Sequence, residues 1–175
     1  QWFSDFLGQP GLRLVRFDPE VRRLASRQWA GEIEAPIEFA DGFPLLVIGE
    51  GSLAELNRRL ASGGHAPVGI ERFRPNLVLA GLEPHDEDRV QELRITTAEG
   101  EVRLKLVKPC GRCPIPDINP DTGATGTAVL DTLQGYRADS RLDGALTFGM
   151  NAIILEGAGH TLRVGDEVSA DWHFN

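Results

Sequence analysis

The 175-residue chain carries 18 basic and 26 acidic side chains, a formal charge of −8, and 41% of its residues are hydrophobic. This length and composition predict one globular domain over residues 1–175, and the acidic balance disfavours a nucleic-acid partner, because nonspecific binding to phosphate backbones depends on clustered positive charge. The apolar runs fall far short of the ~20 residues that span a bilayer and no signal segment opens the chain, so we expect a cytoplasmic protein without a membrane partner.

Short elements are predicted from the N-terminus onward. The chain begins at Gln1 and not at Met, which indicates a fragment or a processed form. Residues 2–7 predict a helix that Gly8 ends, and residues 12–17 alternate apolar and polar side chains as in a half-buried strand. The apolar run 44–48 is typical of a central strand.

The sequence around Ser52 predicts a further helix. Ser52 and Glu55 have the spacing of a capping box, in which the serine hydroxyl satisfies one free amide and the glutamate reaches back to another. Leucines at positions 53, 56 and 60 then share one face, and Gly63 follows as a stop signal.

Strand patterns dominate the remainder of the chain. Residues 76–80 form a short apolar run, residues 101–107 alternate, and residues 130–137 show helical spacing. We expect residues 151–156 to pair with 160–164 and the chain then to turn into 167–170 as a closing β-meander. Many short strands with few helices predict a β-rich α+β fold, barrel-like in architecture.

Both cysteines, Cys110 and Cys113, lie three residues apart in the proline-rich segment 108–123. Two thiols at this spacing can form a redox dithiol, supply half of a zinc site, or place one thiolate on a softer metal. The prolines disfavour the helix that a thioredoxin-like dithiol needs, and the four histidines include no His-x₃₋₅-His pair for zinc. Of the possible metal sites, the residues best support a single thiolate that binds a metal carried by a cofactor.

Counting alone favours two inert cysteines, because cysteine is among the most buried residue types. The polar surroundings, with Lys108 and Arg112, instead predict an electropositive loop that stabilises a thiolate. From the residues alone, both interpretations stay open.

Residues 108–113 (Lys-Pro-Cys-Gly-Arg-Cys) and 118–123 (Ile-Asn-Pro-Asp-Thr-Gly) closely resemble the signature of the MOSC domain, the molybdenum cofactor sulfurase C-terminal domain. The similar branch contains the mitochondrial amidoxime-reducing component and its bacterial relatives. Further segments resemble the family in order and spacing: 41–46, 52–57, 72–76, 130–137, 148–151 and 164–168. The resemblance covers nearly the whole chain and implies a β-barrel-like fold.

The resemblance also implies a molybdenum–molybdopterin cofactor whose sole protein ligand is the second cysteine, here Cys113, as the thiophilicity of molybdenum allows. Arg74 and Asn76 would hold the phosphate or the pterin, since arginine offers a planar fork that matches phosphate oxygens. Asp41, Gly42 and Phe43 would line the cofactor pocket. The alternative for Arg72 and Arg74 is a solvated strand edge.

The activity implied by the resemblance is reduction of N-hydroxylated compounds from N–OH to N–H, in which two electrons and two protons are consumed and water is released. Cys113 is then the catalytic ligand. The chain has too few cysteines for an additional [2Fe–2S] cluster and lacks a Gly-x-Gly-x-x-Gly fingerprint. We therefore expect an external electron-donor protein and a small N-hydroxylated substrate as partners.

Other functions stay open. One cysteine could carry a persulfide and pass sulfur on, the domain could bind molybdenum cofactor or serve a pyridoxal pathway without turnover, or the pair could be a dithiol switch. The family usually carries an N-terminal β-domain that also holds the cofactor, and its absence before Gln1 predicts weak cofactor affinity. Met150 stands where relatives commonly carry Gln, so it either alters a polar contact or fills the core.

The remaining conspicuous side chains are assigned structural roles. His85, in the acidic run 83–88, is predicted to lie on the surface among solvated charges. Trp2, Trp29 and Trp172 are predicted to be packing residues.

Overall fold

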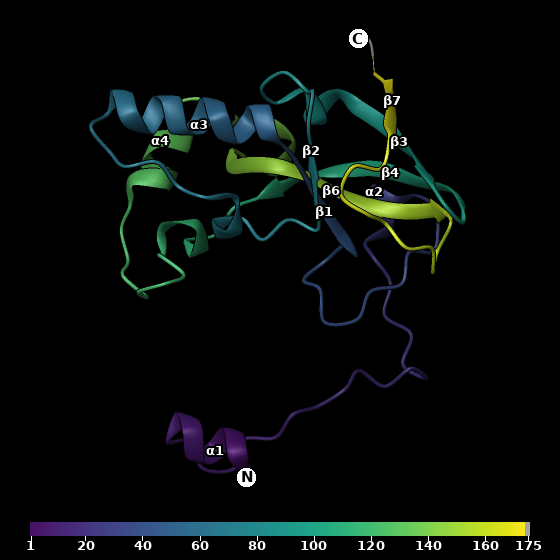
Figure 1. Cartoon of the computed structure of the whole chain (residues 1–175), viewed down its shortest axis with the longest axis horizontal. Helices are drawn as coiled ribbons and strands as arrows, with labels where there is room; N and C mark the ends of the chain where they lie inside the picture. The colour runs from purple at the N-terminus through teal and green to yellow at the C-terminus, as the bar shows by residue number, and fades with distance from the viewer. Residues whose placement is uncertain (174–175) are drawn as a thin grey trace.

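The computed structural model, which describes residues 1–173, is a curled mixed sheet with short helices (Figure 1). The strands are β1 (Leu45–Gly49), β2 (Leu77–Leu79), β3 (Val90–Thr97), β4 (Gly100–Gly111), β5 (Ala138–Asp139), β6 (Ala145–Glu156) and β7 (Val168–Trp172). The helices are α1 (Trp2–Leu7), α2 (Arg27–Ala30), α3 (Glu50–Ser62) and α4 (Ala128–Gln134), with 3-10 turns η1 (Ile70–Arg72), η2 (Asp86–Arg89), η3 (Ile115–Asp117) and η4 (Ser140–Leu142). The sheet curls into a half-barrel, which confirms the β-rich α+β class.

The sheet has the strand order β2-β1-β6-β4-β3-β7, and β5 adds to β6. Only the pair β1–β2 is parallel among these described pairs, and the others are antiparallel. The central β4–β6 ladder contains register shifts between Arg103 and Leu104, between Leu106 and Lys108, and between Pro109 and Gly111. Such bulges bend a strand and strengthen its twist, so the C-terminal end of β4 turns away from a flat sheet.

Apolar side chains form three buried clusters. The first lies within the sheet, the second lies beneath α3 and α4, and the third joins the segment before β1 to β6 through Phe43 and Ile153. In the second cluster Phe73 stacks on Phe148 with ring centroids 4.3 Å apart. Figure 1 shows α3 and α4 together at one end of the sheet. Met150 is buried in the first cluster, which favours its core-filling role.

The N-terminal segment departs from two predictions. Helix α1 is confirmed, and Gly8 ends it in the left-handed region (φ 62). Trp2 is 65% exposed and packs on Phe3 and Phe6, with ring centroids 5.0 and 5.1 Å away, so its predicted packing role is confirmed only within α1. Trp29 and Trp172 are half-buried. Residues 12–17 form no strand, and the segment runs away from the sheet towards α1 (Figure 1). Their alternation has no partner edge to pair with.

The predicted C-terminal meander is also wrong. Residues 160–164 form no strand, and β7 pairs with β3 at the other side of the sheet. One edge of β6 is taken by β4, and the other is taken by β1 at residues 150–152. Strand β7 therefore pairs with the free edge of β3, where its backbone N–H and C=O groups find hydrogen-bond partners.

The capping box predicted at Ser52 is wrong, although the helix itself is confirmed. Helix α3 begins one turn earlier with Gly49 as its N-cap, and Glu55 pairs instead with Arg58 and Arg59. The Ser52 hydroxyl lies 2.6 and 2.7 Å from the two carboxyl oxygens of Glu87 and accepts a 2.9 Å hydrogen bond from the His85 N–H. A buried carboxyl from η2 thus lies against the first turn of α3.

The acidic run 83–88 is not solvated as predicted, because Glu87 is fully buried. The His85 ring lies between Tyr136 and Phe148, with centroids 5.5 and 5.9 Å away. Both of its ring nitrogens are buried without a hydrogen-bond partner among the described residues. Burial, followed by the charge of Arg137, lowers the pKa of His85 to about 4, whereas burial raises the pKa of Glu87.

We predict that Ser52→Ala destabilises the protein by about 1–3 kcal/mol, because the buried Glu87 carboxyl loses a donor and the His85 N–H loses its acceptor. Urea unfolding at pH 7 measures the loss. Ser62→Ala is the matched control, since the exposed Ser62 hydroxyl donates only to the Arg58 carbonyl at the end of the same helix. Equal stability of the two variants would contradict the structural role of Ser52.

We predict that His85→Asn makes stability less sensitive to acid. The folded-state pKa lies below the ordinary value of 6.5, so the unfolded state binds the proton first, and this stability is present above pH 6.5 and lost as pH falls towards about 4. Asparagine tolerates the positive φ at this position. Between pH 7 and pH 5, the unfolding free energy of the wild type should fall by on the order of 1 kcal/mol more than that of the variant, as measured by urea unfolding. A pH-independent difference between His85→Asn and the wild type would refute the assignment.

Candidate functional site

The two cysteines occupy different environments at the C-terminal end of β4. Cys110 lies within the strand and is half-buried, so the prediction of a loop is wrong for this residue. Cys113 lies beyond the strand and is exposed, so the prediction of a buried cysteine is wrong for this one. Both are free thiols. The pair is therefore asymmetric, with one sulfur held by the sheet and the other open to a ligand.

Arg112 joins the cysteine segment to the loop that precedes β2. One terminal nitrogen, Nη1, lies 3.0 Å from the Cys110 sulfur, and the other, Nη2, donates to the Phe73 carbonyl at 2.8 Å. The guanidinium carbon lies 5.2 Å from the centre of the Phe73 ring. Arg72 makes the return contact by donating to the Pro116 carbonyl at 3.1 Å.

These contacts unite two basic segments in an acidic protein. Residues 72–76 and 108–116 contain four basic and no acidic side chains, whereas the chain as a whole has a formal charge of −8. Arg74 is exposed and adopts φ 55, in the left-handed region that residues with a Cβ rarely occupy. The combined segments form a cationic surface beside an exposed thiol, as anion binding requires.

Asn76 combines a structural bond with a possible ligand contact. Its Oδ1 accepts from the Leu46 N–H at 2.8 Å, while its own N–H donates to the Leu46 carbonyl at 2.9 Å. The side chain thereby continues the pairing of β1 with β2 by one step. Its Nδ2 is not used in this pairing, so the donor end of the amide is the part that suits a ligand.

Asp41, Gly42 and Phe43 lie in a bend immediately before β1. Arg23 holds this bend by donating to the carbonyls of Glu38, Ala40 and Asp41, each at 2.7 Å. Phe43 is buried, and the Lys108 ammonium lies 5.9 Å from its ring and 5.7 Å from that of Trp29. The structure thus brings the Phe43 bend to β4 through Lys108, and the Arg74 loop to the cysteine segment through Arg112 and Arg72.

Three further residues shape this region through contacts that the sequence did not indicate. Asn151 donates from Nδ2 to the carbonyls of Lys108 and Pro109 at 3.3 and 3.5 Å, across the irregular part of the ladder. The buried Asp117 accepts from the N–H groups of Val129 and Leu130 at 2.8 and 3.3 Å, so it caps α4. The sequence indicated Arg112 only as a positive charge near the thiols, because its contact with Phe73 spans 39 residues of sequence.

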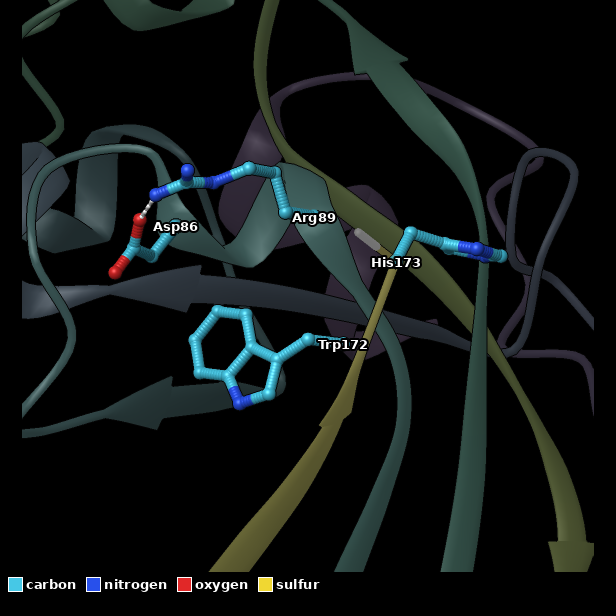
Figure 2. Close-up of a pocket in the computed structure, with 4 residues that line it drawn as sticks. All are labelled: Asp86, Arg89, Trp172 and His173. Atoms are coloured by element: carbon cyan, nitrogen blue, oxygen red, sulfur yellow. Dashed lines mark hydrogen bonds and ion pairs between the residues drawn. The ribbon is translucent and has the colours of Figure 1, made fainter. Parts of the chain in front are cut away.

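A hollow of about 260 Å³ lies elsewhere, between η2 and the end of β7. Figure 2 shows its lining residues Asp86, Arg89, Trp172 and His173, with Arg89 paired to Asp86. It contains no thiol, and its guanidinium is already matched by a carboxylate. We therefore assign the candidate site to the cysteine segment on its chemistry and not to this hollow on its shape.

Residues 1–173 contain neither a cluster of metal-binding side chains nor a membrane-spanning helix. No group of three or more His, Cys, Asp or Glu side chains is arranged to hold a metal ion. Likewise, no described helix combines the length and apolar character needed to cross a bilayer.

Comparison with known proteins identifies one family. A model described as MOSC domain matches residues 34–169. The chain is 37% identical to the mouse mitochondrial amidoxime-reducing component 1 over 175 residues, which cover 96% of this chain and 49% of that protein. It is 35% identical to the human mitochondrial amidoxime reducing component 2 (78% of this chain, 39% of that protein) and 34% identical to molybdenum cofactor sulfurase of Oryza sativa subsp. japonica (95% and 22%). The chain thus spans at most about half the length of these relatives.

Asn76 offers a test of which atoms are structural. We predict that Asn76→Ala costs about 1 kcal/mol, because the Leu46 N–H loses its acceptor, whereas Asn76→Asp stays within about 0.5 kcal/mol by retaining an oxygen at that place. Urea unfolding compares the two. Equal losses would show that the side-chain oxygen is not what supports β1.

Proposed function

The chain belongs to the MOSC domain family, and from that premise we propose that it binds molybdenum cofactor through Cys113 and serves a reductase of N-hydroxylated compounds. The observation that carries the proposal is the exposed Cys113 thiol in a segment tied by Arg112 and Arg72 to the Arg74 loop. Two of the relatives bear names of amidoxime-reducing components, and amidoximes contain an N–OH group.

The residues present fit such a cofactor in charge and in donor type. A thiolate suits a thiophilic metal, and an exposed one leaves room for ligands that a pterin brings with it. The Arg74 guanidinium suits a phosphate group, and Nδ2 of Asn76 adds a neutral donor beside it. Phe43, held by the packing around Lys108, would form an apolar wall. We assign Asp41 and Gly42 to the same wall, because their bend is fixed by Arg23.

The protein's part in the reaction is to hold and orient. When bound, the cofactor supplies the two-electron chemistry that converts N–OH to N–H with release of water. Cys113 would hold the metal, and Arg74 and Asn76 would hold the anionic end of the cofactor. We further propose that a separate protein donates the electrons and that the chain works in the cytoplasm, where its two free thiols stay reduced.

A sulfur-carrier function is the second candidate. Cys110 favours it, because a guanidinium 3.0 Å from the sulfur would stabilise a persulfide anion. One relative is named molybdenum cofactor sulfurase. In this case sulfur would pass from Cys110, and Cys113 would be its neighbour.

We predict that Cys113→Ala abolishes molybdenum binding and turnover, whereas Cys110→Ala loses much less of either, because only Cys113 would be a ligand of the metal. The natural full-length protein is reconstituted with molybdenum cofactor, reduced with an artificial donor and assayed with an amidoxime. Elemental analysis gives molybdenum per protein, and the amidine product gives turnover.

The two candidate functions give different results in this experiment. No turnover by wild-type protein that holds molybdenum would remove the reductase. Equal molybdenum loss in both variants, or loss only in Cys110→Ala, would contradict the choice of Cys113. Cyanide-labile sulfur that depends on Cys110 would support the carrier instead.

A further inference from the structure

We propose that Arg112 is a positioning residue: it fixes the backbone at Arg74 and so sets the direction in which the Arg74 side chain leaves its loop. That Arg74 holds a cofactor rests on the proposed function. That Arg112 controls its backbone rests on the contacts of this chain alone.

The peptide group between Phe73 and Arg74 is fixed from both sides. Its carbonyl accepts from Nη2 of Arg112 at 2.8 Å, and its N–H donates to the Glu71 carbonyl at 3.2 Å. Arg74 follows with φ 55, a conformation that is unfavourable for a side chain with a Cβ. A strained backbone of this kind persists only where its surroundings hold it in place. Arg112 supplies the long-range part of that hold.

Arg112 is itself anchored at its other end. Nη1 lies 3.0 Å from the Cys110 sulfur, and the Arg112 N–H donates to the Leu146 carbonyl at 2.7 Å. Its guanidinium carbon lies 5.2 Å from the centre of the Phe73 ring, which is 1% exposed and stacked on Phe148. Strand β6 and the apolar cluster below α3 therefore fix the position of Arg112, and Arg112 in turn fixes the loop that contains Arg74.

Arg112 has little capacity left for a ligand of its own. Both terminal nitrogens are engaged, and Nε is buried, with no hydrogen-bond partner among the described residues. The exposed Arg74 is the basic residue of the pair that a ligand can reach. Arg112 consequently acts through Arg74. Two simultaneous contacts need the planar fork of arginine, because the lysine ammonium is a compact point charge.

Hydrogen exchange of the ligand-free protein tests this link directly. We expect Arg112→Gln and Arg112→Lys to speed exchange of the Phe73, Arg74 and Asn76 amides about three- to tenfold, the effect of one lost hydrogen bond. Amides of β3 and of residues 100–106 in β4 report whether the fold is intact and should be unchanged. Arg58→Gln is the matched control, since Arg58 is exposed on α3 and pairs only with Glu55 among the described residues.

The conservative variant distinguishes positioning from charge. Arg112→Lys keeps the charge, so wild-type exchange in that variant would overturn the proposal, as would unchanged exchange in a folded Arg112→Gln. If the glutamine variant does not fold, Arg112→Lys alone decides the comparison.

A second measurement relates the link to the proposed function. In full-length protein reconstituted at limiting cofactor, Arg112→Lys should lower molybdenum per protein several-fold while turnover per bound molybdenum stays at the wild-type value. Wild-type occupancy would overturn the positioning role. Absence of turnover despite bound molybdenum in the wild type would remove the reductase but leave the hydrogen-exchange result intact.

Discussion

The antiparallel pairing of β4 with β6 is the constraint on which the rest of the structure depends. Both strands are twelve residues long, and β6 also pairs with β1 and β5. Gly149 lets β1 approach β6 closely, because a Cβ at φ 78 would lie 2.6 Å from Cγ1 of Ile48 and 2.7 Å from the Val47 carbonyl. The register shifts along β4 then carry the chain out of the sheet, with Cys110 still held and Cys113 released. The position of the candidate site follows from this ladder.

Around η2 and α3, the fold is also supported by buried polar groups. The Ser52 hydroxyl connects the His85 amide to the Glu87 carboxyl, and Arg137 pairs with Asp88 at 2.7 Å while donating to the Thr147 carbonyl at 3.0 Å. Removing one partner from such a pair leaves an uncompensated buried group, which costs far more than a surface ion pair contributes. The turn η2, which looks like a solvated acidic loop, is therefore part of the core that holds α3 against the sheet.

Local patterns were sufficient for some elements and not for others. The apolar runs at 44–48 and 76–80 became β1 and β2, and the leucine face of α3 is buried as its spacing indicates. The alternation at 12–17 failed because a strand needs an available edge, and Ser52 failed as a cap because its partner Glu87 lies 35 residues away. At the site, the basic residues and the thiols could be identified from the sequence and its family resemblance. The contacts that assemble them, such as Arg112 with Phe73, depend on the fold.

The two basic segments have a consequence for how a ligand arrives. Since residues 72–76 and 108–116 carry four positive charges and no negative ones in a chain of −8, the remaining residues carry −12. The charge beside the exposed thiol is thus opposite in sign to that of the chain as a whole. The four charges attract an anion to this part of the surface, but salt screens their field beyond about 8 Å at physiological ionic strength. The four charges therefore orient an incoming anion only once it has come within about 8 Å of them.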